Sequence, residues 1–345
     1  MKVYTIKDIA AMAGVSVTTV SRVLNRRPDV NSATREKVER IIRENHFVGN
    51  TNARGLKQGN EVIGVVVRGR SNPFLSALSE AILARADQMP ETFVTEYIDE
   101  QADEFATALR LTRQNHVKGL IFVGSLIDGR VKAIRSLEIP MAFTTVNAES
   151  ASLPRASSVA VDDRSMGRLV AEELLNHGHR QIAVFGSNPV AGDSLAMRFQ
   201  GFCDAFADRG LTYDRSLYRE SRFSFEAGYE TAKAFFAERT DATALFAMSD
   251  TVAVGAIRAL RDLGKSVPED VSVIGFDGVD IGRFTLPRLT TVEQPVDEIA
   301  RRSVNLLLDM MEKDAAPRHI LVEAAFRKRE SVAANPHDRQ KEGMD

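Results

Sequence analysis

Residues 8–25 read DIAAMAGVSVTTVSRVLN, and this stretch decides the fold of the amino-terminal part of the chain. Apolar residues recur at helical spacing up to Ala13, and Gly14 then breaks the pattern. Ser16 is a cap candidate for a second helix, whose apolar stripe continues through residues 17–25. Two helices joined by so short a turn indicate a helix-turn-helix, in which the second helix lies in the major groove of DNA.

The exposed face of this second helix carries side chains that suit DNA recognition. Arg22 can donate two hydrogen bonds to guanine, and the methyl groups of Val17 and Thr18 can contact a thymine methyl. Ser21 and Asn25 can hold phosphates. The alternative is a small solvated helical hairpin, and the spacing alone favours that alternative.

The charge of the chain is unevenly distributed. Residues 1–60 carry 11 basic and five acidic side chains, a net charge of +6, whereas the rest of the chain carries −8, for a total of −2. A basic head on an acidic body indicates a polyanion partner for the head only. The excess of basic side chains in the head supports the DNA-reading interpretation against that of a solvated hairpin.

A third helix and a short polar stretch complete the head. The helix is expected over Ala33–Asn45 with Ser32 as its cap. Residues 50–57 are too short to form a stable helix in isolation. Leu56 within them can act as an apolar wedge in a DNA minor groove or can pack on its own domain, and the residues alone favour packing.

Composition excludes several classes of protein. The chain has 345 residues, enough for two or three domains, and one cysteine, Cys203, which excludes an internal disulfide. No Cys/His cluster has zinc spacing, and no apolar run reaches the ~18 residues of a membrane span. No apolar signal-peptide core follows the N-terminus. We expect a cytoplasmic protein that takes no metal, cofactor or membrane partner.

The rest of the chain alternates apolar strand patterns with helical patterns. Strands are expected at 62–67, 93–98, 119–124, 139–144, 158–161, 182–186, 243–247 and 271–276. Continuous apolar strands separated by helices indicate α/β architecture with parallel sheets covered on both faces. The pattern forms two series, which predicts two lobes with a ligand site in the cleft between them, at the carboxyl ends of the strands.

Several motifs together resemble the lac repressor family. In the head they are residues 8–25, TREKVERII (34–42) and ARGLKQGN (53–60). In the body they are SNPF (71–74), HGHRQIAVFG (177–186), MRFQGF (197–202), AMSDTVAVGA (247–256), VSVIGFDG (271–278) and LTTVEQP (289–295). The head match is almost gapless, and the body motifs are modest singly, but their order and spacing cover nearly the whole chain.

The resemblance implies a small all-α helix-turn-helix head and a two-lobed body like the periplasmic sugar-binding proteins. The expected divisions are a DNA-binding domain (1–49), a hinge helix and linker (50–60), an effector-binding and dimerisation domain (61–330) and a polar tail (331–345). Crossover strands would join the lobes, with about 61–161 and 290–320 in the first lobe and about 162–289 and 321–330 in the second.

The resemblance also implies which residues contact DNA. Val17, Thr18 and Arg22 would read bases, and Leu56 would wedge into the minor groove when two hinge segments pair on an operator. The full set of DNA-contact candidates is Thr5, Ser16, Val17, Thr18, Thr19, Ser21, Arg22, Asn25, Asn50, Ala53, Arg54 and Leu56.

The matching body positions are candidates for the effector site: Phe74, Thr145, Arg198, Phe223, Ser249, Asp250, Asp277 and Gln294. Phe223 would stack on a sugar face, and Arg198 and Asp277 would bond ligand hydroxyls or charged groups. The alternatives are that both phenylalanines belong to the core, that Asp250 only caps a helix, and that Arg198 pairs with Asp277.

The chain departs from the family in two places. Thr145 and Val146 stand where many members carry Asp-Arg, of which the Asp binds sugar, and Arg68 and Arg70 lie near the expected cleft mouth. A sugar phosphate is therefore an option beside a neutral sugar. The tail lacks the apolar heptads of a tetramerising coiled coil, which favours a homodimer on a palindromic operator.

The residues also bear on two other functions, an enzyme and a secreted sugar-binding protein. An enzyme is disfavoured because the chain lacks a dinucleotide-binding glycine motif, a P-loop and a nucleophile elbow. A secreted sugar-binding protein would explain the body but not the head. The sequence therefore predicts a DNA-binding transcription regulator, most simply a repressor, whose cleft closure is linked to its hinge. It does not determine whether the effector induces or corepresses.

Overall fold

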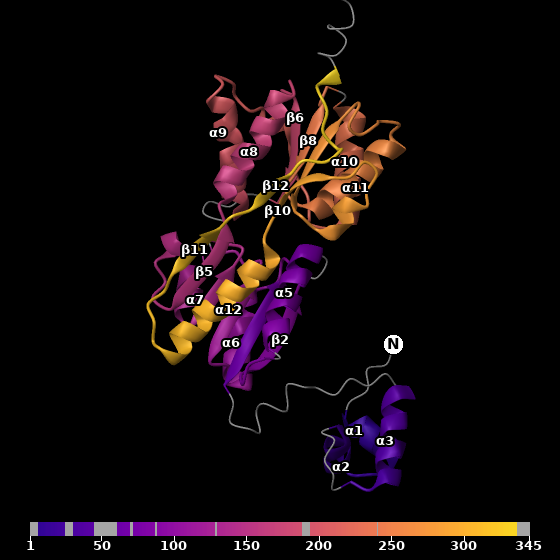
Figure 1. Ribbon diagram of the computed structural model, residues 1–345, viewed down its shortest axis with the longest axis vertical. Coiled ribbons are helices and arrows are strands. Elements are labelled where there is room, and N and C mark those ends of the chain that lie inside the picture. Colours follow the sequence, from indigo (N-terminus) through magenta and orange to yellow (C-terminus); the bar gives the residue numbers. More distant parts are fainter. Residues whose placement is uncertain are drawn as a thin grey trace, which may run out of the picture. The chain divides into compact units, whose positions relative to one another are not determined.

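In the computed structural model, the described residues are 6–24, 30–44, 61–69, 72–86, 88–127, 130–187, 194–239 and 241–336. The chain separates into two compact units, Met1–Asn60 and Glu61–Asp345 (Figure 1).

The described part of the first unit is a three-helix head. Its helices are α1 (Ile6–Ala13), α2 (Val17–Leu24) and α3 (Ser32–Glu44). Their apolar faces meet in a small core of Ile9, Ala10, Ala13, Val20, Val23, Val38 and Ile41. Gly14 takes a φ of 64° in the turn between α1 and α2, a value that glycine adopts at little cost. The predicted helix-turn-helix is present.

The caps of the head helices are partly as expected. The Ser16 hydroxyl accepts a hydrogen bond from the Thr19 amide at 3.1 Å, so Ser16 caps α2 as predicted. The expected cap of α3 is wrong. Asn31 accepts from the Thr34 amide at 3.0 Å, and Ser32 is already the first helical residue. Asn is an equally good cap, so adjacent Asn and Ser leave this choice open in the sequence.

The first lobe of the second unit is built on a six-stranded parallel sheet in the order β11-β5-β4-β3-β1-β2. The strands are β1 (Val62–Arg68), β2 (Thr92–Ile98), β3 (Gly119–Val123), β4 (Met141–Thr144), β5 (Ala156–Val161) and β11 (His319–Val322). The helices are α5 (Pro73–Ala86), α6 (Glu104–Asn115), α7 (Val131–Arg135) and α12 (Val296–Glu312). The apolar residues of α5 and α12 join one core and those of α6 join another, so helices cover both faces.

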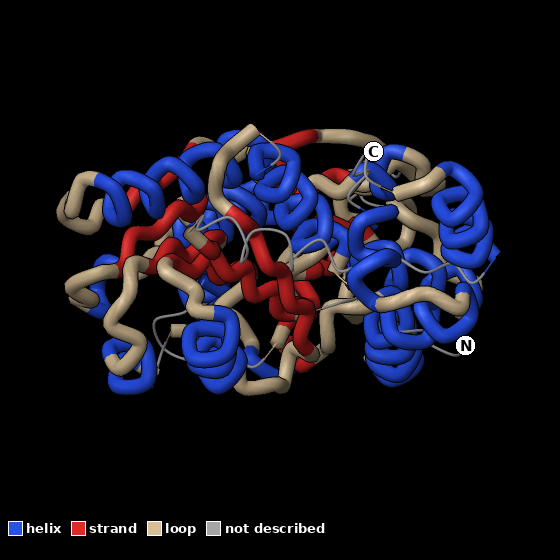
Figure 2. Tube along the Cα trace, turned by 90° about the horizontal axis from the view of Figure 1, so that it is seen from below, coloured by secondary structure: helices blue, strands red, loops and turns tan. Residues whose placement is uncertain are grey.

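The second lobe has the sheet order β12-β10-β9-β8-β6-β7. Its strands are β6 (Ile182–Gly186), β7 (Tyr218–Glu220), β8 (Ala244–Ala247), β9 (Ser272–Asp277), β10 (Thr290–Glu293) and β12 (Ala325–Arg327). Its helices are α8 (Asp163–Asn176), α9 (Ser194–Ala207), α10 (Phe225–Glu238) and α11 (Asp250–Asp262). All pairings are parallel except that of β12 with β10. Figure 2 shows the strands of the body between helices.

Three crossovers join the lobes, after β5, after β10 and after β11, and Figure 1 shows these connections. The expected placement of 290–293 in the first lobe is wrong, because β10 pairs with β9 in register Thr290 with Ile274. The chain crosses to the first lobe only after Glu293, the last residue of β10. Pro295 follows and has no N–H group to continue the hydrogen bonds of the sheet. The return crossing follows Val322, slightly later than expected.

Helices α8 and α9 touch backbone to backbone. A Cβ added at Gly167 would lie 1.9 Å from the carbonyl oxygen of Arg198, and one at Gly201 would lie 1.8 Å from that of Arg164. These distances are far below contact distance, so only glycine fits at either position. The close approach places the first two turns of α8 beside residues 198–201 of α9, and Arg198 lines the cleft.

Two absences concern the described residues alone. Among them no helix is long and apolar enough to cross a bilayer. Across the same ranges no group of His, Cys, Asp and Glu side chains gathers as a metal site would.

Replacing Gly201 by alanine is expected to lower the free energy of unfolding by about 3 kcal/mol, because the new methyl group has no space against Arg164. Urea unfolding followed by circular dichroism measures this loss. Gln200→Ala is the matched control, since Gln200 is exposed on the same helix and its loss should cost less than about 0.5 kcal/mol. Equal stabilities of the two variants would contradict the close helix contact.

Candidate functional site

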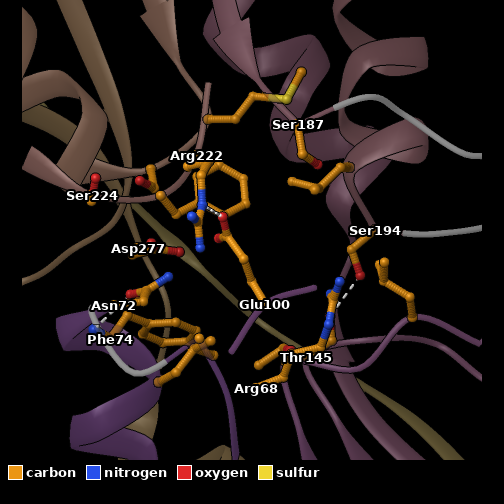
Figure 3. Close-up of a pocket in the computed structure, with 18 of the residues that line it drawn as sticks. Arg68, Asn72, Phe74, Glu100, Thr145, Ser187, Ser194, Arg222, Ser224 and Asp277 are labelled. Atoms are coloured by element: carbon orange, nitrogen blue, oxygen red, sulfur yellow. Dashed lines mark hydrogen bonds and ion pairs between the residues drawn. The ribbon is translucent and has the colours of Figure 1, made fainter. Parts of the chain in front are cut away.

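A cleft of about 720 Å³ lies between the two lobes of the body (Figure 3). The first lobe lines it with segments that follow β1, β2, β3 and β4, and the second lobe with segments that follow β6, β7, β8 and β9. This is where open α/β sheets bind ligands, and the volume suits a small molecule.

Seven of the eight effector candidates line this cleft: Phe74, Thr145, Arg198, Phe223, Ser249, Asp277 and Gln294. Phe74 is buried and Phe223 half-buried, and each also packs against the hydrophobic core, so the core interpretation and the cleft interpretation both hold. The structure brings these residues together, and their contact with an effector stays a prediction.

Arg198 is fully engaged within the second lobe. It is 5% exposed and donates to Asp163 Oδ1 through Nη2 at 2.7 Å and through Nε at 3.1 Å. Its Nη1 donates to the Met248 carbonyl at 2.6 Å, and its guanidinium carbon lies 3.3 Å from the centre of the Phe276 ring. The carboxylate that pairs with Arg198 is therefore Asp163 on α8, and not Asp277 as in the alternative drawn from the sequence.

Burial is the largest influence on the pKa values of Asp163 and Asp277. It raises the pKa of Asp163, and the adjacent Arg198 opposes that rise. Burial also holds the pKa of Asp277 well above its ordinary value, again opposed by Arg198 and reinforced by Asp250. Asp277 Oδ1 accepts from Gln294 Nε2 at 2.9 Å, which ties this carboxyl to the second crossover.

Two cleft residues have strained backbones. Thr145 has a φ of 73° and Asp277 a φ of 115°, values that side-chain-bearing residues rarely adopt. Such strain persists only where surrounding structure imposes it, and it gathers at functional sites. The Thr145 carbonyl accepts from the Ser194 hydroxyl at 2.6 Å, which joins the two lobes (Figure 3).

Ser249 lines the cleft as expected and also caps α11, whereas Asp250 departs from the expectation. The Ser249 hydroxyl accepts from the Val252 amide at 3.3 Å. Asp250 does not line the cleft. Its side chain is fully buried and accepts from the Thr291 hydroxyl at 2.5 Å and the Val279 amide at 2.8 Å. Asp250 is therefore neither the cap nor a lining residue, because its carboxyl turns inward to β10.

The burial of Asp250 has two consequences. It raises the pKa of this carboxyl to about 7. It also requires a glycine beside it, because a Cβ at Gly275 would lie 2.1 Å from Asp250 Oδ1.

An ion pair between the lobes was missed by sequence reasoning. Arg222, after β7, pairs with Asp99 at 3.1 Å, and Asp99 lies after β2. Arg222 also pairs with the adjacent Glu100 (Figure 3). All three line the cleft. The only available signal was their place after strands, and nothing in the sequence pairs residues more than a hundred positions apart.

The head carries the candidate nucleic-acid interface. On α2 the side chains of Val17, Thr18 and Arg22 are exposed, and Ser16 is exposed just before it. Thr19 is half-buried, and its hydroxyl hydrogen bonds with that of Ser16 at 2.9 Å. The other DNA candidates lie outside the described residues or side chains: Thr5, Ser21, Asn25, Asn50, Ala53, Arg54 and Leu56.

Comparison with known proteins agrees with both parts. Residues 5–50 match the family described as bacterial regulatory proteins, lacI family, and residues 171–332 match a periplasmic binding protein-like domain. The transcriptional regulator MalR of Clostridium butyricum is 32% identical over 94% of this chain and 98% of its own. The chain belongs to the lac repressor family.

Two solved structures of transcription regulators are similar to this chain over nearly its whole length. The lac repressor dimer bound to operator and the anti-inducer ONPF has a TM-score of 0.70 and 28% identity, covering 96% of this chain and all of that chain. The regulator CelR in complex with cellobiose has a TM-score of 0.69 and 27% identity, covering 95% and 99%. The protein is thus a helix-turn-helix transcriptional regulator, and its relatives are regulators rather than enzymes.

Asp250→Asn is expected to change how stability depends on pH. The native carboxyl keeps its proton up to about pH 7, whereas the unfolded one loses it near the ordinary value of 3.8. Between these values the native state binds more protons, so rising pH lowers the free energy of unfolding of the wild type relative to the variant, with a slope of at most about 1.4 kcal/mol per pH unit.

Urea unfolding at intervals from pH 4.5 to 7.5 measures this difference. Asp280→Asn, at an 87%-exposed side chain, controls for the loss of one surface carboxylate. A wild-type-to-variant difference that stays constant across the range would contradict the raised pKa of Asp250.

Proposed function

We propose that this regulator represses transcription by binding a palindromic operator as a homodimer in the cytoplasm, under the control of a sugar-like effector in the cleft. The observation that carries the proposal is the exposed face of α2, where Val17, Thr18 and Arg22 lie side by side on the second helix of a helix-turn-helix. These are residues that can read base edges from the major groove.

Charge supports the assignment of DNA to the head. The head carries +6 and the body −8, so a dimer would present about +12 to the operator phosphates. The acidic body would be repelled by the same phosphates. Binding should therefore weaken steeply as the salt concentration rises.

Features of both the head and the body support a homodimer. A helix-turn-helix dimer binds two half-sites related by a two-fold axis. On the second lobe, Phe284 is 81% exposed and Leu286 is 80% exposed, and apolar side chains of this size gathered on a surface favour contact with another protein. A solved relative is a dimer on its operator.

The charges of the cleft favour a neutral effector over a sugar phosphate. Arginines of the lining already form ion pairs with carboxylates, Arg198 with Asp163 and Arg222 with Asp99 and Glu100. The lining also includes the serines that can bond hydroxyl groups and the apolar faces that can stack on a ring: Ser125, Ser187, Ser194, Ser221, Ser224, Ser249, Phe74 and Phe223. A relative binds cellobiose.

The proposed control links the cleft to the hinge through lobe closure. A ligand that bonds Asp277 acts directly on Gln294, which lies in the crossover between β10 and α12. A change in lobe pose would then decide whether two hinge segments, each with its Leu56, pair on the operator. The ligand can shift this equilibrium only by its preference for one pose.

Arg22→Ala is expected to erase discrimination between operator sequences, with a loss of about 1–3 kcal/mol on the preferred site and little loss on others. The preferred site is found by selection from random duplexes, and affinities are measured by fluorescence anisotropy at fixed salt. A loss that is uniform across sequences would make Arg22 a phosphate contact.

The same assay tests the homodimer. A duplex with a single half-site should bind far more weakly than the palindrome, because it holds only one of the two heads. Equal affinity for both duplexes, or a complex with one copy of the chain by light scattering, would contradict it.

A thermal-shift screen tests the effector. D-Ribose, D-glucose, maltose and cellobiose are compared with D-ribose 5-phosphate and D-glucose 6-phosphate. We expect a neutral sugar to raise the melting temperature, since saturation to 100 times Kd stabilises by about 2.7 kcal/mol, and to change operator affinity. Stabilisation by the phosphates alone would overturn the neutral-effector proposal.

A further inference from the structure

Glu104 is a buried carboxyl that lies behind the cleft wall rather than in it. It is the first residue of α6 and is 1% exposed. Its Oε2 accepts from the Ser125 hydroxyl at 2.6 Å, and its Oε1 accepts from the Leu126 amide at 3.2 Å. Both partners line the cleft, whereas Glu104 does not.

The position of Glu104 joins two segments of the first-lobe wall. One is the segment after β3, which contains Ser125 and Leu126. The other is the segment after β2, which carries Asp99 and Glu100 and leads directly into α6. Since Asp99 and Glu100 pair with Arg222 of the second lobe, Glu104 links the wall to the contact between the lobes.

The helix itself does not need this carboxyl. Asp103 already caps α6, accepting from the amides of Phe105 at 3.0 Å and Ala106 at 3.2 Å. A buried carboxylate is costly, and an apolar side chain of similar size would be easier to bury. What the carboxyl supplies is two directed hydrogen bonds to a segment that lines the cleft.

The electrostatic surroundings of Glu104 agree with this role. The charged groups that face it are Arg68 on β1 and Arg130 before α7, and both favour its ionised form. Burial outweighs them and raises the pKa of Glu104 above its ordinary value. Ionised Glu104 accepts both hydrogen bonds, whereas the protonated form has one oxygen that must donate.

We propose that Glu104 is a positioning residue for effector binding. It holds Ser125 and Leu126 in the conformation that binds the ligand. This inference rests on the proposed effector function of the cleft. Glu104 acts through its two partners and does not touch the ligand. Its effect on ligand affinity is therefore indirect, because it orders the segment of Ser125 and Leu126 before the ligand binds.

Amide hydrogen exchange of the full chain without any sugar tests the positioning. Glu104→Gln is isosteric and uncharged, and we expect exchange in peptides covering 124–127 to be about tenfold faster, as for loss of a charge-assisted hydrogen bond. Glu230→Gln, at an exposed residue of α10, is the matched control and should leave these peptides unchanged.

The pH dependence of amide exchange distinguishes this positioning role from a general contribution of Glu104 to the stability of the fold. As the pH falls through the raised pKa of Glu104, the wild-type carboxyl becomes neutral like the glutamine. The ratio of exchange rates between variant and wild type should therefore approach one at low pH and rise with pH. A ratio that is one at every pH overturns the proposal, and so does a raised ratio that does not change with pH.

Sugar affinity tests whether the positioning by Glu104 affects effector binding. For the sugar that stabilises the wild type most in the thermal-shift screen, Glu104→Gln should raise Kd about tenfold and leave operator affinity without sugar unchanged. Unchanged sugar affinity overturns the proposal. If no sugar binds the wild type, the proposed effector fails, while the exchange experiment still decides whether Glu104 orders the wall.

Ser125→Ala keeps the proposal testable if Glu104→Gln fails to fold. It removes one of the two hydrogen bonds and leaves the carboxyl in place. Faster exchange of 124–127 in this variant supports the positioning role, and unchanged exchange overturns it.

Discussion

The backbone contact between α8 and α9 is the constraint on which the second-lobe side of the cleft depends. Gly167 and Gly201 let the two helices meet without intervening side chains, so that Arg198 in the second turn of α9 reaches Asp163, the first residue of α8. The same guanidinium lies over Phe276 and bonds the Met248 carbonyl. One close contact between helices therefore arranges the ends of β8 and β9, where the cleft residues emerge.

The two lobes are joined by polar contacts at the cleft and by three chain crossovers. The contacts are the Ser194 bond to Thr145 and the ion pairs of Arg222 with Asp99 and Glu100. Exposed ion pairs are individually worth little, so these pairs add little to the free energy needed to change the pose of the lobes. The cleft is closed by weak contacts and bordered by a crossover. Such a cleft suits a sensor, because a ligand of ordinary affinity can shift the equilibrium between poses of the lobes.

The fold was predictable where the sequence pattern was long and continuous. The buried strands of both sheets read as apolar runs, and the helices between them read at helical spacing. β7 and β12 were not predicted, because three residues are too few to show a period. The lobe of β10 was misassigned, since a strand pattern shows that a strand exists but not which sheet it joins.

The sequence by itself determined the helix-turn-helix, the alternation of strands and helices, and most candidates for the cleft, because these depend on local spacing and on positions after strands. The tertiary structure decided the partners. Arg198 pairs with Asp163 rather than Asp277, Asp250 turns inward, and Arg222 reaches the other lobe. Such pairings join residues far apart in the chain, and only packing brings their atoms within hydrogen-bond distance.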